Sequence, residues 1–481
     1  MLNPNSLPSI AGGQSISGEM AFNDVAELRK ALTAGYGTDV ASLTGGGALR
    51  IQSLEKTLLS TIQENKHFAL FNALAKSDAT ATVDEWTEMS SVGGFLGGST
   101  NTETGTIAAA TGTYARRTGL VKYLMTRREV SFVTTLQNAL ADAEAVEQQN
   151  GALQLLTDAE FLCFEGDSAV VPTEFDGIKA QIVGLGASDH ILNADGSSLA
   201  SINLVNTAAK TITGYGNFGT PTHLFMSQST QADFDNGLDP AFRVPLTDVP
   251  NGGIMLGSPV KGIRTSWGDI ATVPDVFIRD GDQQAPFEVD FAALASANTF
   301  APASVTVATA SDAASKFTTG RDGNYYWAVT GVNAAGQSVV TKTTQTAVAV
   351  GEKATLTITA SVGGQETGYV IYRSKLNGTN TTSDFRFVGR VAKAGATTTF
   401  VDNNTNIPGT STAYMLNMSA GAKAINWRQL LPMLKFPLYP TNSATVPWAQ
   451  LLFGYLRIGK RKHHVIIKNI LPNSATWRPF G

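Results

Sequence analysis

Cysteine is almost absent from this chain, because Cys163 is the only one among 481 residues. A single cysteine excludes an intrachain disulfide and any zinc site built from cysteines, and it is compatible with a reducing cytoplasm. Cys163 stands in the apolar run 161–164, so we predict a small core residue and not a nucleophile. The fold must therefore be held by packing and polar contacts alone.

Charged residues are scarce as well, at 15% of the chain against roughly a quarter in typical globular proteins. The net charge of -4 argues against a surface devoted to gripping nucleic acid, although it leaves room for a local basic patch. With 43% hydrophobic residues the chain can bury a large core. Its length exceeds what one core usually supports, so we expect two or more domains.

Long apolar runs are missing, and no segment approaches the roughly 20 residues that a membrane span needs. The first residues show no basic region followed by an apolar stretch, so we expect no secretion signal. We therefore expect no membrane partner.

Catalytic and nucleotide-binding motifs are also missing. The chain has no Gly-x-x-x-x-Gly-Lys-Ser/Thr, no His-Glu-x-x-His, no Gly-x-Ser-x-Gly and no Gly-x-Gly-x-x-Gly that opens a helix. The glycine-rich segment 44–48 lacks the phosphate-binding lysine, which favours a flexible link between two helices. We expect no enzyme, no catalytic residue and no cofactor.

Metal-binding patterns are weak. The segment 233–239 offers oxygen ligands, but its glycine comes one position too early for a calcium loop and the closing glutamate is missing. An Asx-rich turn is the favoured interpretation. His67, His190 and His223 are solitary, which favours structural roles, and adjacent His463 and His464 would point to opposite faces of a strand. We expect no metal site.

The N-terminal part of the chain predicts an arm followed by helices. Residues 1–20 are rich in Ser, Gly, Pro and Asn and cannot nucleate a core. A helical pattern begins near Asn23, and a second pattern from Ile51 to Ile62 has apolar residues at spacings of three and four.

Residues 79–128 form a long excursion rich in Thr, Val and Gly, without a helical stripe. Such loops are uncommon in compact domains unless they serve a function. Its two arms carry opposite charge, so we predict contacts between the arms or with another subunit. The predicted contact residues are acidic before the tip, glycine at the tip and basic after it: Asp84, Glu85, Glu88, Gly93, Gly94, Gly97, Gly98, Arg116, Arg117, Arg127 and Arg128.

Residues 131–165 give the strongest helical signal, with one apolar side and one acidic side and a possible bend at Gly151. Residues 170–300 then alternate strands and helices, which predicts an α+β unit. Strands are expected at 223–226, 263–267 and 275–278, and a helix at 229–236.

From Ala301 the pattern becomes all-β. Seven short strands within about a hundred residues are typical of an immunoglobulin-like sandwich. Alternation places Tyr325, Trp327 and Val329 on one face, which predicts an inward aromatic stripe. The predicted strands are 304–308, 323–333, 339–346, 354–358, 368–373, 385–391 and 397–402.

Two apolar strands, 449–458 and 464–471, end the pattern and are joined by a basic run. Two strands alone are unstable, so they must pair with material that precedes the sandwich, which makes the sandwich an insertion. The run Lys460, Arg461 and Lys462 predicts a basic contact with packaged nucleic acid or with a neighbour's acidic patch. A solvated hairpin turn is the alternative.

The order of these segments resembles the major capsid proteins of tailed bacteriophages of the Hong Kong 97 type. The segments VDEWTEMSSVGGFLGGST at 83–100, YARRTGLVKYLMTRREVSF at 114–132 and LLPMLKFPLYP at 430–440 are similar to such chains. The segments GNYYWAVTGVNAAGQS at 323–338 and GYVIYRS at 368–374 resemble fibronectin type III or immunoglobulin-like modules.

The resemblance implies an α+β capsid fold with an inserted all-β immunoglobulin-like sandwich. Its parts would be an N-terminal arm with helices at 1–75, an extended loop at 78–128, a spine helix of the peripheral domain at 129–169, an axial domain at 170–300, the inserted sandwich at 301–413 and a return to the peripheral and axial body at 414–481. Some relatives crosslink through a lysine in the extended loop, but residues 78–121 contain none. We expect no crosslink of that kind.

The resemblance also implies a function and partners. The chain would form pentamers and hexamers of an icosahedral phage head, assembled in the bacterial cytoplasm, that encloses double-stranded DNA without sequence-specific binding. Portal, scaffolding and decoration proteins would be further partners. A shell protein of an encapsulin-like nanocompartment and a surface adhesion protein that displays the sandwich are the alternatives.

Overall fold

The computed structural model describes residues 67–136, 143–199, 202–237, 262–282, 300–419, 421, 423–440 and 443–480. The predicted arm at 1–20 and the helices that begin near Asn23 and Ile51 lie outside these residues. The chain divides into two compact units, one formed by Met1–Thr61 with Thr134–Ala143 and one formed by Ile62–Val133 with Glu144–Gly481. The second unit contains all the strands of the described residues.

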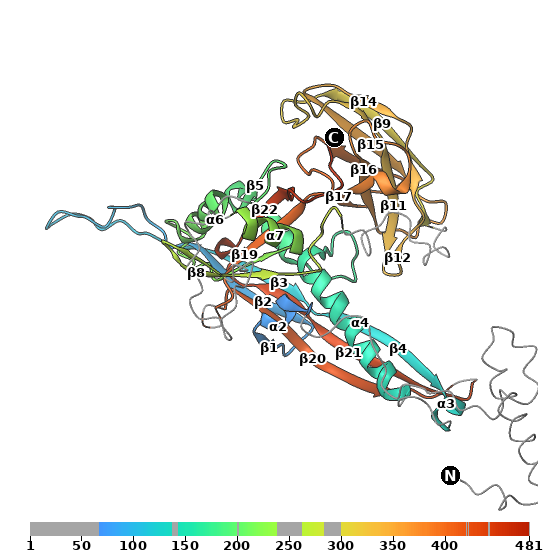
Figure 1. Cartoon of the computed structure of the whole chain (residues 1–481). Helices are drawn as coiled ribbons and strands as arrows, with labels where there is room; N and C mark the ends of the chain where they lie inside the picture. Colours follow the sequence, from blue (N-terminus) through green and yellow to red (C-terminus); the bar gives the residue numbers. More distant parts are fainter. Residues whose placement is uncertain are drawn as a thin grey trace, which may run out of the picture. The chain divides into compact units, whose positions relative to one another are not determined.

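One sheet of this unit has four strands, in the order β1-β20-β21-β4. Helix α4 runs alongside β21 and β4 (Figure 1). Arg128 on β4 donates to Glu147 and Gln154 of α4, and Gln450 on β21 donates to the backbone oxygen of Gln148. The elements are β1 (Lys76–Asp78), β20 (Ile425–Pro437), β21 (Thr445–Ile458), β4 (Lys122–Ser131) and α4 (Ala143–Glu165).

The predicted helix at 131–165 is confirmed from Ala143 to Glu165. The first part of the predicted range is not part of this helix. β4 ends at Ser131, the short α3 covers Phe132–Leu136, and residues 137–142 lie outside the described ranges. Gly151, where a bend was expected, lies where α4 meets β21, and a Cβ there would collide with the Gln450 side chain. The close approach of β21 to α4 therefore explains why a residue without a side chain occupies position 151.

A second, six-stranded sheet has the order β5-β22-β19-β6-β8-β7. Alternate residues of its central strands face two different cores, as the two-residue period of a strand requires. On β6, Leu224 and Met226 pack with α6 and α7, while Phe225 lies beside Phe164 at the end of α4. The elements are β5 (Ile191–Asn193), β22 (Val465–Ile470), β19 (Ser411–Leu416), β6 (His223–Met226), β8 (Gly268–Pro274), β7 (Gly262–Thr265), α6 (Ile202–Thr213) and α7 (Gln228–Gly237).

Residues 304–402 form two larger facing sheets, β18-β15-β9 and β12-β11-β16-β17 with β13 beside β11, and a two-stranded sheet, β10-β14. Their shared core contains Tyr325, Trp327 and Val329, so the predicted aromatic stripe is confirmed. The strands are β9 (Ser304–Ser311), β10 (Gly323–Tyr325), β11 (Trp327–Asn333), β12 (Gly336–Gln337), β13 (Thr341–Lys342), β14 (Thr346–Val348), β15 (Glu352–Thr359), β16 (Gly368–Ser374), β17 (Phe385–Ala392) and β18 (Thr397–Asp402). We call this part the sandwich.

The outer face of β11 and β16 is buried too. Ala328, Val332 and Tyr372 pack against Val170 and Val171, which follow α4. The sandwich is therefore joined to the rest of the unit through a hydrophobic contact, and not only through its two connecting segments.

The closing strands pair with segments that precede the sandwich, as predicted. β21 pairs antiparallel with β4, and β22 pairs parallel with β5. The two closing strands do not pair with each other, because the turn η9 (Arg461–His463) between them carries the chain from one sheet to the other. The hairpin-turn alternative for the basic run is therefore wrong.

Two smaller predictions are wrong. Residues 275–278 do not form a strand, because β8 ends at Pro274 and Asp275 turns back to accept the backbone N–H of Phe277. Residues 228–237 form α7, so the expected Asx-rich turn is a helix as far as Gly237. In α7 the Asp233 carboxylate is buried and accepts the backbone N–H of Asn473, a contact that the local sequence does not show.

Candidate functional site

The most unusual feature of the unit is a two-stranded hairpin that pairs with no other strand of the described residues. β2 (Val83–Ser91) and β3 (Thr113–Leu120) run antiparallel, and residues 92–112 connect them (Figure 1). The hairpin ends at Leu120, and the next residues enter β4 of the four-stranded sheet.

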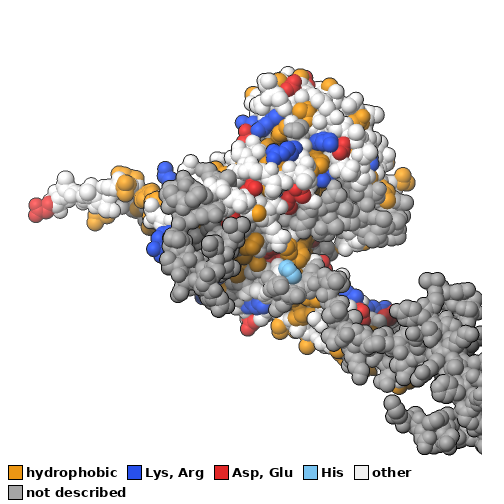
Figure 2. Space-filling view, viewed as in Figure 1, with side chains coloured by type: hydrophobic (Ala, Val, Ile, Leu, Met, Phe, Trp, Pro, Cys, Tyr) orange, Lys and Arg blue, Asp and Glu red, His pale blue; other side chains and the backbone are white. Residues whose placement is uncertain are grey.

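The tip of the hairpin exposes large apolar side chains. Val92, Phe95, Leu96 and Ile107 are between 75% and 87% exposed. Hydrophobic side chains are visible along this projecting segment in Figure 2. Scattered apolar residues are normal on a surface, but a group at the end of a protruding ribbon indicates a contact surface.

Glycines shape the tip. Gly93, Gly94 and Gly97 have φ values of 88°, 74° and 85°, in the left-handed region that favours glycine. A Cβ on Gly93 would also collide with the backbone of Thr111. Gly98 lies against the Phe95 ring. All four predicted tip glycines thus lie in the segment that connects β2 and β3, and Gly97 and Gly98 belong to the turn at 96–99.

The predicted acidic and basic residues of the two arms meet within this chain. Arg116 pairs with Glu85, and Arg117 pairs with Glu88 at 3.1 Å. Arg461 from the basic run also reaches Glu88, at 3.0 Å, and Lys462 donates to the backbone oxygen of Ser90. Lys460 begins the same turn. The basic run thus lies against the hairpin.

Arg127 and Arg128 do not join this group. Both lie on β4, where Arg127 pairs with Glu129 and Arg128 pairs with Glu147 of α4. The four arginines look like one group in the sequence but are divided between the hairpin and the sheet.

Asp84 fixes the base of the hairpin. Its carboxylate accepts two hydrogen bonds from Arg428, at 2.9 and 3.1 Å, one from Tyr455 at 2.5 Å and one from Arg457 at 3.4 Å. Burial alone would raise the pKa of Asp84, but the hydrogen bonds from Arg428 and Tyr455 and the two arginine charges outweigh it and lower that pKa. These three partners of Asp84 were not predicted from the sequence. The one indication for them is that they are polar residues in segments that are otherwise apolar.

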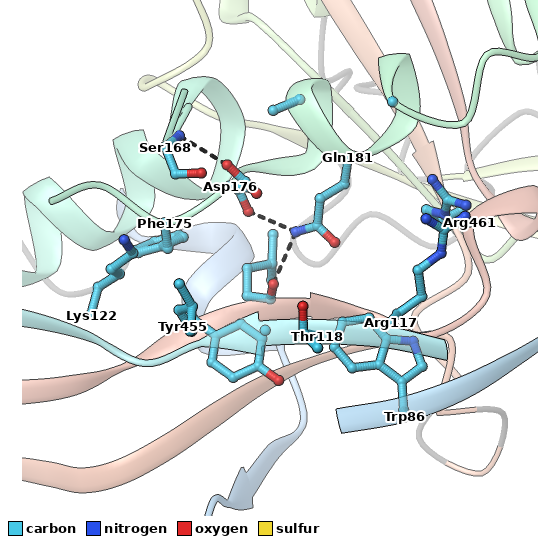
Figure 3. A pocket seen from close by; sticks show the side chains of 15 residues that line it. Trp86, Arg117, Thr118, Lys122, Ser168, Phe175, Asp176, Gln181, Tyr455 and Arg461 are labelled. Atoms are coloured by element: carbon cyan, nitrogen blue, oxygen red, sulfur yellow. Dashed lines mark hydrogen bonds between the residues drawn. The ribbon is translucent and has the colours of Figure 1, made fainter. Parts of the chain in front are cut away.

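A cavity of about 310 Å³ lies between the hairpin base and α5 (Ile178–Val183). Figure 3 shows Arg117, Lys122 and Arg461 around it, with Asp176 as the carboxylate of the lining. Gln181 spans the cavity wall and donates to the backbone oxygens of Asp176 and Leu456 (Figure 3). This lining contains no histidine and no cysteine, and Asp176 is its one carboxylate.

A buried carboxyl pair attaches α2 (Ala69–Ala73) to α4. Glu160 accepts the backbone N–H groups of Leu70 and Phe71, each at 2.7 Å, and is fully buried. Burial and the neighbouring Asp275 raise the pKa of Glu160 to about 9, so the pair holds a proton at neutral pH. Its contacts make this pair a structural anchor.

His190 is buried and is not solitary. Its Nδ1 lies 2.9 Å from the backbone oxygen of His464. Burial lowers the pKa of His464 to about 3, so this ring is neutral. His463 lies in the turn η9 and His464 just before β22, so they do not share a strand. Among the described residues, no group of three His, Cys, Asp or Glu side chains can hold a metal ion.

Comparisons with known proteins point to one class. The major capsid protein of Staphylococcus phage S25-3 is 25% identical over 456 residues, which cover 92% of this chain and 95% of the relative. The putative major capsid protein of Enterococcus phage phiEF24C is 26% identical over 475 residues, which cover 92% of this chain and 94% of the relative. The chain is a structural protein of a phage capsid. Its role is structural and not enzymatic, in line with these relatives.

The remaining comparisons do not strengthen this assignment. No protein-family model matches the capsid chain. Among solved structures, the capsid of a native GTA particle is similar to this chain at 10% sequence identity and a TM-score of 0.47. The match covers 90% of this chain and 100% of the GTA chain. In the part of the capsid chain that the structure describes, no helix is long and apolar enough to cross a membrane.

Proposed function

We propose that the chain self-assembles, through pentamers and hexamers, into the icosahedral head of a tailed phage that encloses double-stranded DNA. The observation that carries this proposal is the β2–β3 hairpin, whose apolar tip is exposed on the single chain. Two-stranded ribbons are marginal in water, so the tip gains order and buries its apolar surface by lying on a neighbouring copy.

The charges of the hairpin differ between its two faces. On the face of β2 that carries Asp84, Glu88 is 11% exposed and is held by Arg117 and Arg461 of the same chain. On the opposite face, the Arg116 side chain is 74% exposed, so its pair with Glu85 is weak and can exchange for a partner on a neighbour. One face therefore holds the hairpin on its own chain, and the other face is available for contact.

The proposal extends to the parts of the chain. The α+β body corresponds to a Hong Kong 97-type fold, with α4 as spine helix, residues 170–300 as axial domain and 1–75 as N-terminal arm. Residues 301–413, which contain the sandwich, are an inserted immunoglobulin-like domain, and 414–481 returns to the body. Assembly takes place in the bacterial cytoplasm with portal, scaffolding and decoration proteins, and the DNA is enclosed without sequence-specific contacts.

The test compares particle formation by the full chain and by a Phe95→Ser/Leu96→Ser double variant. The wild type should give closed shells or capsomers in electron micrographs, and the variant should remain unassembled with an unchanged circular dichroism spectrum. Val362→Ser is the matched control, because Val362 is a fully exposed apolar residue of the sandwich. A wild-type chain that stays monomeric at high concentration, or a tip variant that assembles normally, would contradict the proposal.

A further inference from the structure

Strand β9 forms an open edge of the sandwich. It is the end strand of the sheet β18-β15-β9, and it pairs with β15 over all of its eight residues. Thr341 of the facing sheet donates to the backbone oxygen of Pro302, just before β9 begins. Within the described residues, no strand is paired with the second side of β9. Such an edge presents backbone groups that can pair with another strand.

The backbone groups of β9 that point away from β15 can be assigned by residue. Asp312, directly after β9, donates its backbone N–H to Gly351 at 2.9 Å, in the same register as the strand pair. Because hydrogen-bonded and non-hydrogen-bonded pairs alternate along antiparallel strands, the even-numbered residues of 304–310 bond to β15. Val305, Val307 and Thr309 therefore direct their N–H and C=O groups outward.

The features that usually protect an edge strand are missing from β9. Native edge strands carry charges, prolines or bulges that discourage pairing with another chain. β9 has the sequence SVTVATAS, with no charge and no proline, and its register with β15 is unbroken. The other described edge strands of at least eight residues, β2, β3, β4 and β17, all carry charged residues. Among these long edges, β9 is thus the one that is suited to accept a strand.

The side chains of β9 are also compatible with an identical strand beside it. Val305 and Val307 pack against the core of the sandwich, whereas Thr306, Ala308 and Ala310 are exposed on its outer face. Neighbouring strands lie about 4.8 Å apart, and small side chains fit at this spacing. Since β9 has no charged residue, two copies of it bring no like charges together.

We propose that β9 pairs antiparallel with β9 of a second copy of this chain, so that two sandwiches share one continuous sheet. The outward backbone groups all belong to odd-numbered residues, so the ladder joins odd to odd and places the outer faces of both copies on the same side. Each copy has one β9, and the contact therefore closes after two copies and does not grow into a fibre. It is separate from the contact proposed for the hairpin tip.

Disulfide trapping in the full-length protein tests this pairing. In one of the two registers that pair the most residues, Ala308 lies opposite its equivalent in the second copy; in the other it lies opposite Thr306. Under mild oxidation, Ala308→Cys alone reports the first register, and an equimolar mixture of Thr306→Cys and Ala308→Cys reports the second. One of the two samples should give a covalent dimer on a non-reducing gel. Cys163 is buried and does not compete.

Val362→Cys is the control for random collisions, because Val362 is fully exposed and lies outside the strands. The sample that reports the pairing should give several-fold more dimer than this control. A dimer yield no higher than that of Val362→Cys in both samples would overturn the proposal. Because trapping also captures short-lived pairs, the result does not depend on shell assembly.

A second substitution separates edge pairing from other contacts of the sandwich. Adding Thr309→Pro to the trapped variant removes an outward N–H, which an edge strand tolerates, so the dimer should be lost while the unfolding midpoint is kept. If the proline lowers the midpoint, Thr309→Lys takes its place, since it adds a charge to the edge and leaves the backbone unchanged. A dimer that persists in the folded edge variant would overturn the proposal.

Discussion

Asp84 is the residue on which the orientation of the hairpin depends. It stands at the start of β2, while Arg428, Tyr455 and Arg457 come from β20 and β21 near the end of the chain. Its side chain is 14% exposed, so water does not replace these contacts cheaply. The carboxylate is therefore a fixed point between the hairpin and the four-stranded sheet.

Replacing Asp84 with Asn should lower the free energy of unfolding by about 2 kcal/mol, because two arginines lose their anionic partner in a partly buried site. Urea unfolding measures the loss. The wild-type contribution is present above the ordinary carboxyl pKa of 3.8 and is lost as the pH falls through the lowered pKa of Asp84. Asp269→Asn is the control, since its pair with Arg264 is exposed and should contribute nothing measurable. Equal stability of the two variants would refute the assigned role of Asp84.

At the scale of elements, the attachment of α2 to α4 depends on one proton. Glu160 on α4 and Asp275 after β8 are both buried, and no cation of the described residues pairs with either carboxyl group. The first backbone N–H groups of α2 are satisfied by Glu160, which an apolar residue could not do.

This attachment should weaken as the pH rises. Because the pKa of Glu160 is about 9 in the folded chain and 4.5 ordinarily, its stabilising effect is fully present below pH 4.5 and declines up to about pH 9. Thermal unfolding midpoints between pH 5 and pH 9 should fall in wild type and vary less in Glu160→Gln, which does not titrate. Glu103→Gln, at the exposed hairpin tip, should follow wild type. If the unfolding midpoint of Glu160→Gln falls with pH as steeply as that of wild type, other titrating groups cause the loss of stability.

Elements with a local signature could be predicted from the sequence. Most strands of the sandwich, β6, α7 and the main length of α4 follow from periodicity and turn residues. Two predicted strands of the sandwich are divided in the structure: 323–333 into β10 and β11, and 339–346 into β13 and β14. Contacts between distant segments could not. Arg127 and Arg128 follow Arg116 and Arg117 closely in sequence, yet a change of sheet at Val121 separates them. His190 and His464 are 274 residues apart, and only the pairing of β22 with β5 brings them together.

At the scale of the whole unit, the final residues bind the sandwich to the body. Backbone N–H groups of Thr476 and Trp477 donate to Asp282, and the backbone oxygen of Pro479 accepts from Leu376 of the sandwich at 2.8 Å. The Trp477 ring packs on Gly409 and lies 4.8 Å from the Arg386 guanidinium. The sandwich is thus less independent than its position in the sequence implies.

Trp477→Ala should loosen the sandwich without unfolding it, because its own core lies between its two sheets. We expect a loss of roughly 3 kcal/mol, typical for a buried tryptophan, and faster proteolysis of the segments that join the sandwich to the body. Limited proteolysis followed by mass spectrometry locates the cuts. Arg478→Ala, an exposed neighbour in the same tail, should behave as wild type. If both variants are cut alike, the tail does not hold the sandwich.

The strand orders also set the timing of folding. In the four-stranded sheet β20 and β21 stand between β1 and β4, and in the six-stranded sheet β22 and β19 stand between β5 and β6. Both sheets therefore stay incomplete until β20, β21 and β22 have been synthesised. The sandwich, whose strands are contiguous in sequence, can pair its strands earlier, whereas the two sheets of the body are completed only after those later strands have left the ribosome. A subunit truncated before β20 would carry unpaired inner strand edges and could not enter a shell.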